Sequence, residues 1–483
     1  MKHLYAAATL AFLGPGLSLF AQPISLHPEN PHYFLYRGKP TVLITSGEHY
    51  GSVINPGFNF NLYLETIHKA GFNHTRVFLG DYLEGSNDFC IVNNPLAPAE
   101  GKFLAPWLRS DQPGFAFGGN KFDLSKWNPV YFERLHKFMQ KASDMGIVVE
   151  CDLFFEGMNW EKMPMNSGNN INNTTVLANP EDYMTLSNGN ILEYQKKYCL
   201  RLINELNRYD NLILNIANEP WFFNQEHRGF ASPARDATKE WVGEVSEWIV
   251  SAEKQLPKKH LISVDYTNEG RAISREELQK YWKNISVFNH HYDKDAASVR
   301  ANYQSVPRPF AFNETGLMPV YTKAYRIQGW RYLMCGGALY NNLDFTFQAG
   351  HEDGSGKAEF SCDGYKGSGD PRVRNEISIL ASFFSTIDFV KMRPAQDIFV
   401  VYYGDRDLYA LANDGKQYAI YVVGGENSWY RLNVPFGKYT IQYMDPVTGI
   451  KILETTVNHN SGDLRLDGPD YAEDLAIRIN RVE

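Results

Sequence analysis

The sequence predicts an α/β protein in which a (β/α)8 barrel precedes a small all-β sandwich. Between residues 41 and 390, short apolar or β-branched runs alternate with longer amphipathic runs, as in a parallel sheet with crossover helices. After Arg393-Pro394 the chain changes to short alternating runs separated by turns. A length of 483 residues also exceeds what one compact core usually takes. We expect a signal peptide at 1–21, the barrel at 22–393 and the sandwich at 394–483.

The barrel prediction depends on eight candidate strands, the number that this fold requires. They lie at 41–45, 74–79, 147–153, 212–217, 261–264, 286–290, 309–313 and 337–343. Amphipathic helical runs lie at 129–145, 192–206, 238–255 and 374–390. The segments 81–123, 156–190 and 345–370, which follow predicted strands, are too long for plain connections. We expect them to form the walls of a cleft.

The sandwich prediction depends on short alternating runs at 398–403, 417–423, 439–444, 450–456 and 475–479. Asp-Gly, Gly-Gly and Pro-Val-Thr-Gly turns separate them. No pair of acids in this part is arranged for chemistry, so its expected role is to pack against the barrel. Direct glycan binding through Trp429 or Tyr430 is the alternative.

The first residues have the pattern of a cleaved secretory signal. Lys2 and His3 precede an apolar run at 4–20, and the small residue Ala21 comes before Gln22. No cysteine follows the expected cleavage point, and no later segment is long and apolar enough to span a bilayer. We therefore expect a secreted or periplasmic protein without a membrane span or lipid anchor.

Composition narrows the class of ligand. The formal net charge of −8 and the lack of a basic block argue against nucleic acid and anionic membranes as partners. Aromatic residues make up 14% of the chain, and many lie beside polar residues in expected loops, which suits stacking on sugar rings. The five cysteines are too few and too scattered for a disulfide framework or a zinc site. Cys151 and Cys335 lie in apolar runs and are expected to be buried free thiols.

Two glutamates end apolar runs that the prediction assigns to strands. Glu219 ends the run Leu-Asn-Ile-Ala-Asn-Glu before Pro220, and Glu314 ends Pro-Phe-Ala-Phe-Asn-Glu before a Thr-Gly turn. Because barrel strands deliver their C-terminal residues to one functional rim, both carboxyl groups are expected there. Taken singly, each has a structural explanation: Glu219 as a helix N-terminal acid placed by Pro220, and Glu314 as a loop residue.

Two such acids are the groups that cleave a glycosidic bond with retention of configuration. One carboxylic acid protonates the leaving oxygen, while a carboxylate about 5 Å away attacks the anomeric carbon. Glu219 is the expected acid/base, its pKa raised by a nearby negative charge and limited solvation. Glu314 is the expected nucleophile. No cofactor or metal is expected.

The Asn218-Glu219-Pro220 segment resembles the acid/base signature of the retaining glycoside hydrolases of clan A, nearest to the family five cellulases and mannanases. The resemblance implies that Asn218 contacts the sugar 2-hydroxyl, that Glu219 is the acid/base and that Glu314 is the nucleophile. Segments 38–40, 46–51 and 443–449 resemble secreted barrel-plus-sandwich hydrolases of polysaccharide-degrading bacteria.

Further substrate-binding residues follow from the same resemblance. Arg76 resembles the strand-two arginine that hydrogen-bonds the nucleophile, and His290-His291-Tyr292 resembles a His-x-Tyr motif whose tyrosine orients the nucleophile. The alternatives are an ion pair inside the barrel for Arg76 and core roles for His290 and Tyr292. A metal site at the two histidines is not expected, because no third ligand is spaced to join them.

Four more residues complete the predicted site. Glu48 and His49, after the first strand, match positions that grip sugar hydroxyls, with a surface role as the alternative. Trp221 is an aromatic candidate beside the acid/base. Family five enzymes usually present a tryptophan after strand eight, and this chain does not, so Tyr340 or Phe345 is the expected substitute.

Three functions remain open at the level of sequence. The leading hypothesis is a secreted retaining β-glycosidase that hydrolyses a β-glucan or β-mannan type polymer or its oligosaccharides. The second is an exo-acting glycosidase that removes a terminal or side-chain sugar, and the third is a non-catalytic glycan-binding protein. The presence of both Glu219 and Glu314 together with Arg76 argues against the third. Linkage, endo or exo action and oligomeric state are not predicted.

Overall fold

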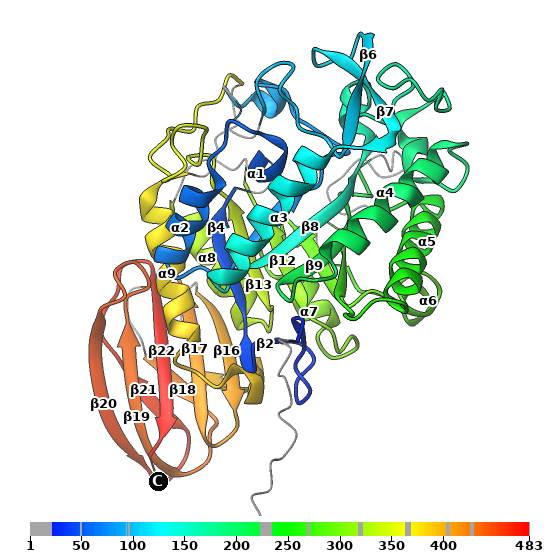
Figure 1. Ribbon diagram of the computed structural model, residues 1–483. Helices are drawn as coiled ribbons and strands as arrows, with labels where there is room; N and C mark the ends of the chain where they lie inside the picture. Colours follow the sequence, from blue (N-terminus) through cyan, green and yellow to red (C-terminus); the bar gives the residue numbers. More distant parts are fainter. Residues whose placement is uncertain are drawn as a thin grey trace, which may run out of the picture.

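The structure, a computed structural model, describes residues 22–482 except 49–50, 93, 95–96, 223–233, 268–270, 317–321, 363–368, 402–405 and 426–428. Eight parallel strands form a nearly closed barrel in the order β4-β13-β12-β11-β10-β9-β8-β5, and helices surround it (Figure 1). Their bounds are β4 Leu43–Gly47, β5 His74–Phe78, β8 Val148–Phe155, β9 Leu212–Asn218, β10 Leu261–Thr267, β11 Val287–His291, β12 Phe310–Glu314 and β13 Leu339–Leu343. Each of the eight strands overlaps a predicted one, and the predicted barrel is confirmed.

The barrel closes between β4 and β5 through the side chain of Asn73. The amide nitrogen of Asn73 donates to the Val42 carbonyl at 2.9 Å, and its side-chain oxygen accepts from the Ile44 N–H at 2.8 Å. These bonds bridge the seam near the start of the two edge strands, where no strand ladder joins β4 to β5.

Nine helices of the described residues surround or cap the barrel. Their bounds are α1 Gly51–Ile54, α2 Phe60–Lys69, α3 Pro129–Asp144, α4 Ile191–Leu206, α5 Asp236–Glu253, α6 Arg275–Lys280, α7 Ala297–Asn302, α8 Thr322–Met334 and α9 Pro371–Phe384. The last one differs from the predicted 374–390. It begins earlier because the Asp370 side chain caps it, accepting from the Arg372 N–H at 2.8 Å, with Pro371 at the first helical position. After Phe384 the backbone hydrogen bonds change from the i→i−4 to the i→i−3 pattern, with the Thr386 N–H donating to the Phe383 carbonyl at 2.9 Å.

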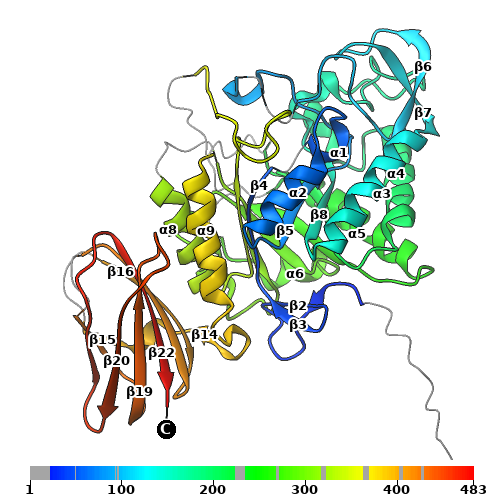
Figure 2. The same ribbon diagram turned by 60° about the vertical axis from the view of Figure 1, so that its left-hand side comes forward.

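The two ends of the barrel are built differently (Figure 2). A small antiparallel sheet lies at the end where the barrel strands begin: β1 Ser25–Leu26, β2 Phe34–Tyr36 and β3 Lys39–Thr41. The opposite end carries the long loops and a hairpin of β6 Trp107–Pro113 and β7 Asn120–Trp127. Short 3-10 helices at Asp88–Cys90, Gly157–Lys162 and Pro180–Met184 lie in these loops. Within the described part of the chain, no helix combines the length and apolarity needed to cross a membrane.

The C-terminal region is a two-sheet β-sandwich, as predicted. One sheet has the order β14-β16-β17-β22-β19-β20 and the other the order β15-β18-β21. The bounds are β14 Arg393–Pro394, β15 Phe399–Val401, β16 Asp407–Asn413, β17 Gln417–Val423, β18 Trp429–Leu432, β19 Gly437–Met444, β20 Lys451–His459, β21 Leu464–Asp467 and β22 Asp474–Arg481. The prediction missed β14, β16, β18 and β21. The last two have four residues each, too few to show a clear alternation.

Helix α8 joins the barrel to the sandwich (Figure 1). Trp330 stacks on Tyr421 of β17 with ring centroids 5.0 Å apart. Arg326, only 2% exposed, lies 2.8 Å from Asp474 of β22 and 2.8 Å from Glu376 of α9. The Tyr421 hydroxyl donates to the same Asp474 carboxylate at 2.7 Å. The junction is therefore a buried, hydrogen-bonded ion cluster set beside an aromatic stack.

The cysteines correct one expectation. Cys90 and Cys362 form a disulfide between the loop that follows β5 and the loop that follows β13. The sequence predicted no disulfide framework and did not reveal this single pair, which forms because the barrel brings distant loops to one rim. Cys151, Cys199 and Cys335 are buried free thiols, as predicted for Cys151 and Cys335.

Replacing Arg326 tests the junction. Arg326→Met should lower the free energy of unfolding by about 3–5 kcal/mol, because it leaves the buried Asp474 and Glu376 carboxylates without their cation. Urea unfolding measures the change. The control is Lys323→Met on the same helix, where an ion pair with Glu473 is exposed and the expected loss is below about 1 kcal/mol. Equal losses in the two variants would contradict a stabilising role for the buried cluster.

Candidate active site

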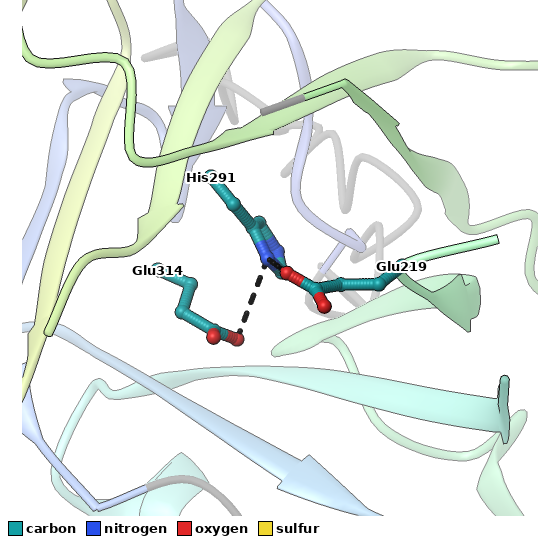
Figure 3. A group of neighbouring side chains, drawn as sticks. All are labelled: Glu219, His291 and Glu314. Carbon is teal, nitrogen blue, oxygen red and sulfur yellow. Dashed lines mark hydrogen bonds and ion pairs between the residues drawn. The ribbon is translucent and has the colours of Figure 1, made fainter. Parts of the chain in front are cut away.

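The structure brings the two predicted glutamates together at the rim. Glu314 is the last residue of β12 and Glu219 directly follows β9. One carboxylate oxygen of each and one ring nitrogen of His291 all lie within 4.8 Å of one another (Figure 3). The backbone of Glu219 has φ 41°, a left-handed conformation that is strained for a residue with a side chain. Its N–H donates to Asp265 at 3.2 Å, which helps to hold this turn.

Arg76 of β5 lies fully buried beneath the acid pair. Its guanidinium lies 2.8 Å from Glu314, 2.7 Å from Asp152 and 3.0 Å from Asp265, and it donates to the Asn218 side-chain oxygen at 2.7 Å. Burial alone lowers an arginine pKa, but the carboxylates of Asp152, Asp265 and Glu314 raise the pKa of Arg76 well above its usual value. Arg76 therefore contacts the predicted nucleophile and also forms the barrel ion pair that was its structural alternative.

Asp265 of β10 is a second centre of this network, and the sequence analysis did not identify it. One of its oxygens accepts from Asn215 at 3.1 Å and from Asn289 at 3.0 Å, and the other lies 3.0 Å from both Arg76 and His291. Burial acts to raise the pKa of Asp265, but the charges of His291 and Arg76 reverse this and hold the pKa well below its usual value. Asp265 is thus a permanent anion in the barrel interior.

His291, and not the predicted His290, faces the acids. The Nδ1 atom of His291 lies 2.7 Å from Glu219 and 3.6 Å from Glu314 (Figure 3). His290 packs instead against Phe310 and Tyr332, with the Tyr332 hydroxyl 3.5 Å from its Nδ1, and burial lowers its pKa to about 3. Successive side chains of a strand point to opposite faces, so only one of the two histidines can face the site. The prediction that His290 binds substrate was wrong, and its core alternative describes it.

Tyr292 and Trp221 complete the surroundings of the acids. The Tyr292 hydroxyl donates to Glu314 at 3.1 Å, and its backbone, at φ 54°, donates from N–H to the Glu314 carbonyl at 3.1 Å. The role of Tyr292 in orienting the nucleophile stays a prediction. Trp221 meets His291 edge-on at 5.3 Å and is 4% exposed. Sugar stacking on Trp221 stays a prediction.

The environment sets the protonation of the acid pair. Burial raises the pKa of Glu219, His291 acts in the opposite direction, and the negative charge of Glu314 raises it again. For His291, burial disfavours the charged ring, but Glu314 and Asp265 outweigh burial and raise its pKa well above the usual value. The site therefore keeps one acid inclined to carry a proton beside a cationic histidine and an arginine-paired carboxylate.

A third carboxyl group, Glu156, lies beside Asn218 and was also missed. It follows β8, is 2% exposed, and accepts from the Asn218 amide nitrogen at 3.1 Å. Burial, and then the charge of Glu219, raises its pKa well above the usual value. The sequence did carry a signal: Phe155-Glu156-Gly157 is an apolar strand that ends in a glutamate before a turn residue, the same pattern as at Glu219 and Glu314.

Rim loops place another acid and an aromatic wall near these groups. Tyr82, after β5, stacks on Phe155 with ring centroids 3.5 Å apart. Glu84 accepts from the Tyr82 hydroxyl at 3.3 Å and from the Asn94 amide at 2.5 Å. Burial raises the pKa of Glu84 to about 8. The segment after β5, predicted to form a cleft wall, thus lies against the end of β8.

Two further predicted residues do not reach the substrate side. Glu48 is buried, and its carboxylate accepts from the Gly51 N–H and the Ser52 hydroxyl, each at 2.5 Å. Glu48 therefore caps α1, and neither the predicted substrate contact nor the alternative surface role describes it. Tyr340 is fully buried and donates from its hydroxyl to the Tyr325 carbonyl of α8 at 2.8 Å. The prediction for Tyr340 was wrong, because its position on β13 faces the helices. His49 lies outside the described residues.

A cation is not favoured at this cluster, although Glu219, His291 and Glu314 have suitable ligand atoms within reach of one another. Arg76 already places a positive charge 2.8 Å from one oxygen of Glu314. The arrangement is instead that of an acid pair bridged by a histidine.

Comparisons with known proteins agree with the fold. A family model for a domain of unknown function, DUF6298, matches residues 102–219, a segment that ends at Glu219. A structure described as a candidate glycoside hydrolase from Bacteroides vulgatus ATCC 8482 superposes with a TM-score of 0.66 at 13% identity, covering 97% of this chain and 83% of that one. A glycoside hydrolase family 5 structure from the same organism gives 0.60 at 13% identity, covering 95% and 94%. No curated protein matches in sequence. At such identity these likenesses establish the barrel-plus-sandwich fold.

Replacing Asp265 tests the origin of the charge on His291. Asp265→Asn should lower the pKa of the His291 ring, because it removes one of the three carboxyl groups, Glu314, Asp265 and Glu219, that favour the cation. Nitrogen-15 NMR titration of the histidine rings measures this. The control Asp88→Asn, which removes a rim carboxylate paired with Lys162, should leave the His291 titration unchanged. An unchanged titration in Asp265→Asn would contradict the assignment.

Glu84 should make stability depend on pH. Its folded-state pKa of about 8 lies above the unfolded value of 4.5, so its contribution is fully present below pH 4.5 and is lost as pH rises toward 8. Glu84→Gln removes this titration, and its unfolding free energy should fall less than that of the wild type between pH 5 and 8. Urea unfolding at several pH values measures the slope. The control is Glu133→Gln, whose exposed, Lys137-paired carboxyl has a lowered pKa and titrates below this range. A wild-type slope in Glu84→Gln would rule out the buried titration.

Proposed function

We propose that this protein is a retaining β-glycosidase that hydrolyses a β-linked polysaccharide, of β-glucan or β-mannan type, or its oligosaccharides. The observation that carries the proposal is the separation of Glu219 and Glu314, which bring two carboxylate oxygens within 4.8 Å at the rim of the barrel. Retaining enzymes hold their carboxyl groups about 5–5.5 Å apart, whereas inverting enzymes need about 6.5–9.5 Å to admit a water molecule.

In the first step Glu219 donates its proton to the glycosidic oxygen while a Glu314 oxygen attacks the anomeric carbon. The bond from that carbon to the leaving oxygen breaks, and an ester between the sugar and Glu314 forms. The raised pKa of Glu219 supports its role as the proton donor. Arg76 and Tyr292, at 2.8 Å and 3.1 Å from Glu314, favour its charged form and fix its orientation.

In the second step water attacks the same carbon. Glu219, now deprotonated, takes a proton from that water, the ester bond breaks, and Glu314 is regenerated as a carboxylate. His291 lies 2.7 Å from Glu219, so a cationic ring stabilises the carboxylate that Glu219 becomes between the two steps.

Carbohydrate as the substrate class is supported by the fold likeness to the Bacteroides vulgatus glycoside hydrolases. We propose further that residues 1–21 direct export, so that the enzyme meets its polymer outside the cytoplasm.

The two acids should respond differently to substitution. Glu314→Gln should abolish turnover of aryl β-glycosides. Glu219→Ala should slow both steps and regain activity with azide, because a small anion can attack the sugar ester where general-base help to water is missing. The control is Glu253→Gln, which alters a buried carboxyl bonded to His260 at the opposite end of the barrel and should keep wild-type rates.

The substrate assay decides the proposal. Purified protein is screened against plant, algal and fungal polysaccharides and aryl β-glycosides, with Glu314→Gln as the blank, and proton NMR follows the configuration of the first sugar released. A β-configured product that the blank does not release supports the proposal. An α-configured first product, or wild-type rates in Glu314→Gln, would refute the double-displacement mechanism.

A further inference from the structure

We infer that Glu156 is a further substrate-binding residue, whose free carboxyl oxygen binds the hydroxyl group next to the reacting carbon of the sugar. The inference rests on the proposed glycosidase function. It adds a contact that neither acid of the pair provides.

The strand register places Glu156 at the level of the acid pair. In the parallel ladder of β8 and β9, Phe155 pairs with Asn218, so the next residues, Glu156 and Glu219, leave neighbouring strands at the same height. Neighbouring strands lie about 4.8 Å apart. Glu156 therefore stands beside Glu219 on the rim.

Only one of the two carboxyl oxygens of Glu156 accepts a hydrogen bond within the described part of the chain. Its Oε2 accepts from the Asn218 amide at 3.1 Å. Its Oε1 is buried and accepts no hydrogen bond within the described part of the chain. Buried polar atoms of native proteins almost always have a partner, so an oxygen of this kind marks a place for a ligand or water group.

The neighbouring bonds indicate which ligand group belongs there. Glu156 contacts Asn218, Asn218 contacts Arg76, and Arg76 contacts Glu314, the group that attacks the sugar. In the sugar ring the reacting carbon has two neighbours: the ring oxygen, which cannot donate, and the carbon that bears the 2-hydroxyl, which can. A carboxyl oxygen that needs a donor matches the hydroxyl.

Asn218 supports the same hydroxyl. Its side-chain oxygen is taken by Arg76, and one of its two amide hydrogens points to Glu156. The second amide hydrogen remains to donate to the hydroxyl oxygen, while the hydroxyl hydrogen is donated to Glu156. Hydrogen bonds to this hydroxyl strengthen in the transition state of retaining enzymes, so the contact should act on the rate.

The test compares substrates that have or lack this hydroxyl. The kcat/KM values of wild type and Glu156→Ala are measured with 4-nitrophenyl β-D-glucoside, the β-D-mannoside, and the 2-deoxy glycoside that the two sugars share. On whichever hydroxyl-bearing glycoside the wild type cleaves, Glu156→Ala should lose about fivefold to tenfold in kcat/KM, the effect of a hydrogen bond to an uncharged carboxyl group. On the 2-deoxy glycoside the loss should stay below about twofold. Glu253→Gln, which alters a buried carboxyl at the far end of the barrel, should match the wild type on all three.

Other outcomes overturn the inference. Equal losses on the hydroxyl and 2-deoxy substrates would show that Glu156 acts only on the fold, and wild-type rates would show that it does not act. If Glu156→Ala caused no further loss of kcat/KM on the hydroxyl substrate in a protein that already carries Asn218→Ala, Glu156 would only position Asn218. Should Glu156→Ala not fold, Glu156→Gln keeps the shape of the side chain and should show a smaller loss of kcat/KM that is confined to the hydroxyl substrates.

A wild-type protein that cleaves no glycoside would refute the proposed function and this inference with it. An active wild type with an unaffected Glu156→Ala would refute the inference alone.

Discussion

The buried guanidinium of Arg76 is the interaction on which the rest of the site depends. It lies against the carboxylates of Asp152, Asp265 and Glu314 and against the amide oxygen of Asn218, all inside the barrel. Carboxylates at this depth are tolerable only when they are paired, and removing one partner from such a group costs about 3–5 kcal/mol. The Arg76 guanidinium, which stabilises the polar interior, also pairs with Glu314 and orients the side chain of Asn218, so stability and the proposed chemistry depend on one cation.

The strained backbone at the rim depends on the same network. Glu219 and Tyr292 have φ angles of 41° and 54°, and each directly follows a barrel strand. Such conformations cost about 1–3 kcal/mol and persist only where the surroundings hold them. Here the Glu219 N–H donates to Asp265 and the Tyr292 N–H donates to the Glu314 carbonyl. The Asp265 carboxylate thus helps to hold the turn at Glu219, and the Glu314 backbone carbonyl helps to hold the turn at Tyr292.

The rim loops enclose the acids and so contribute to their proton affinities. The disulfide from Cys90 to Cys362 ties the loop after β5 to the loop after β13. Next to it, Asp88 contacts Lys162 of the loop after β8 at 2.8 Å. Three segments that are distant in sequence are therefore fastened together over the strand ends. Reduced solvation raises the pKa of Glu219, the property that a proton donor needs near neutral pH.

The sequence by itself determined the barrel, the sandwich and the meeting of Glu219 with Glu314. Strand periodicity is local, and every parallel strand of a barrel ends at the same rim. Tertiary structure decided which neighbours complete the site. His290 was chosen because His290-His291-Tyr292 resembles a His-x-Tyr motif, but the facing of two adjacent strand residues is set by how the strand lies in the sheet, and His291 is the one that faces the acids. The contact of Glu156 with Asn218 depends on the register between two strands, which no local pattern encodes.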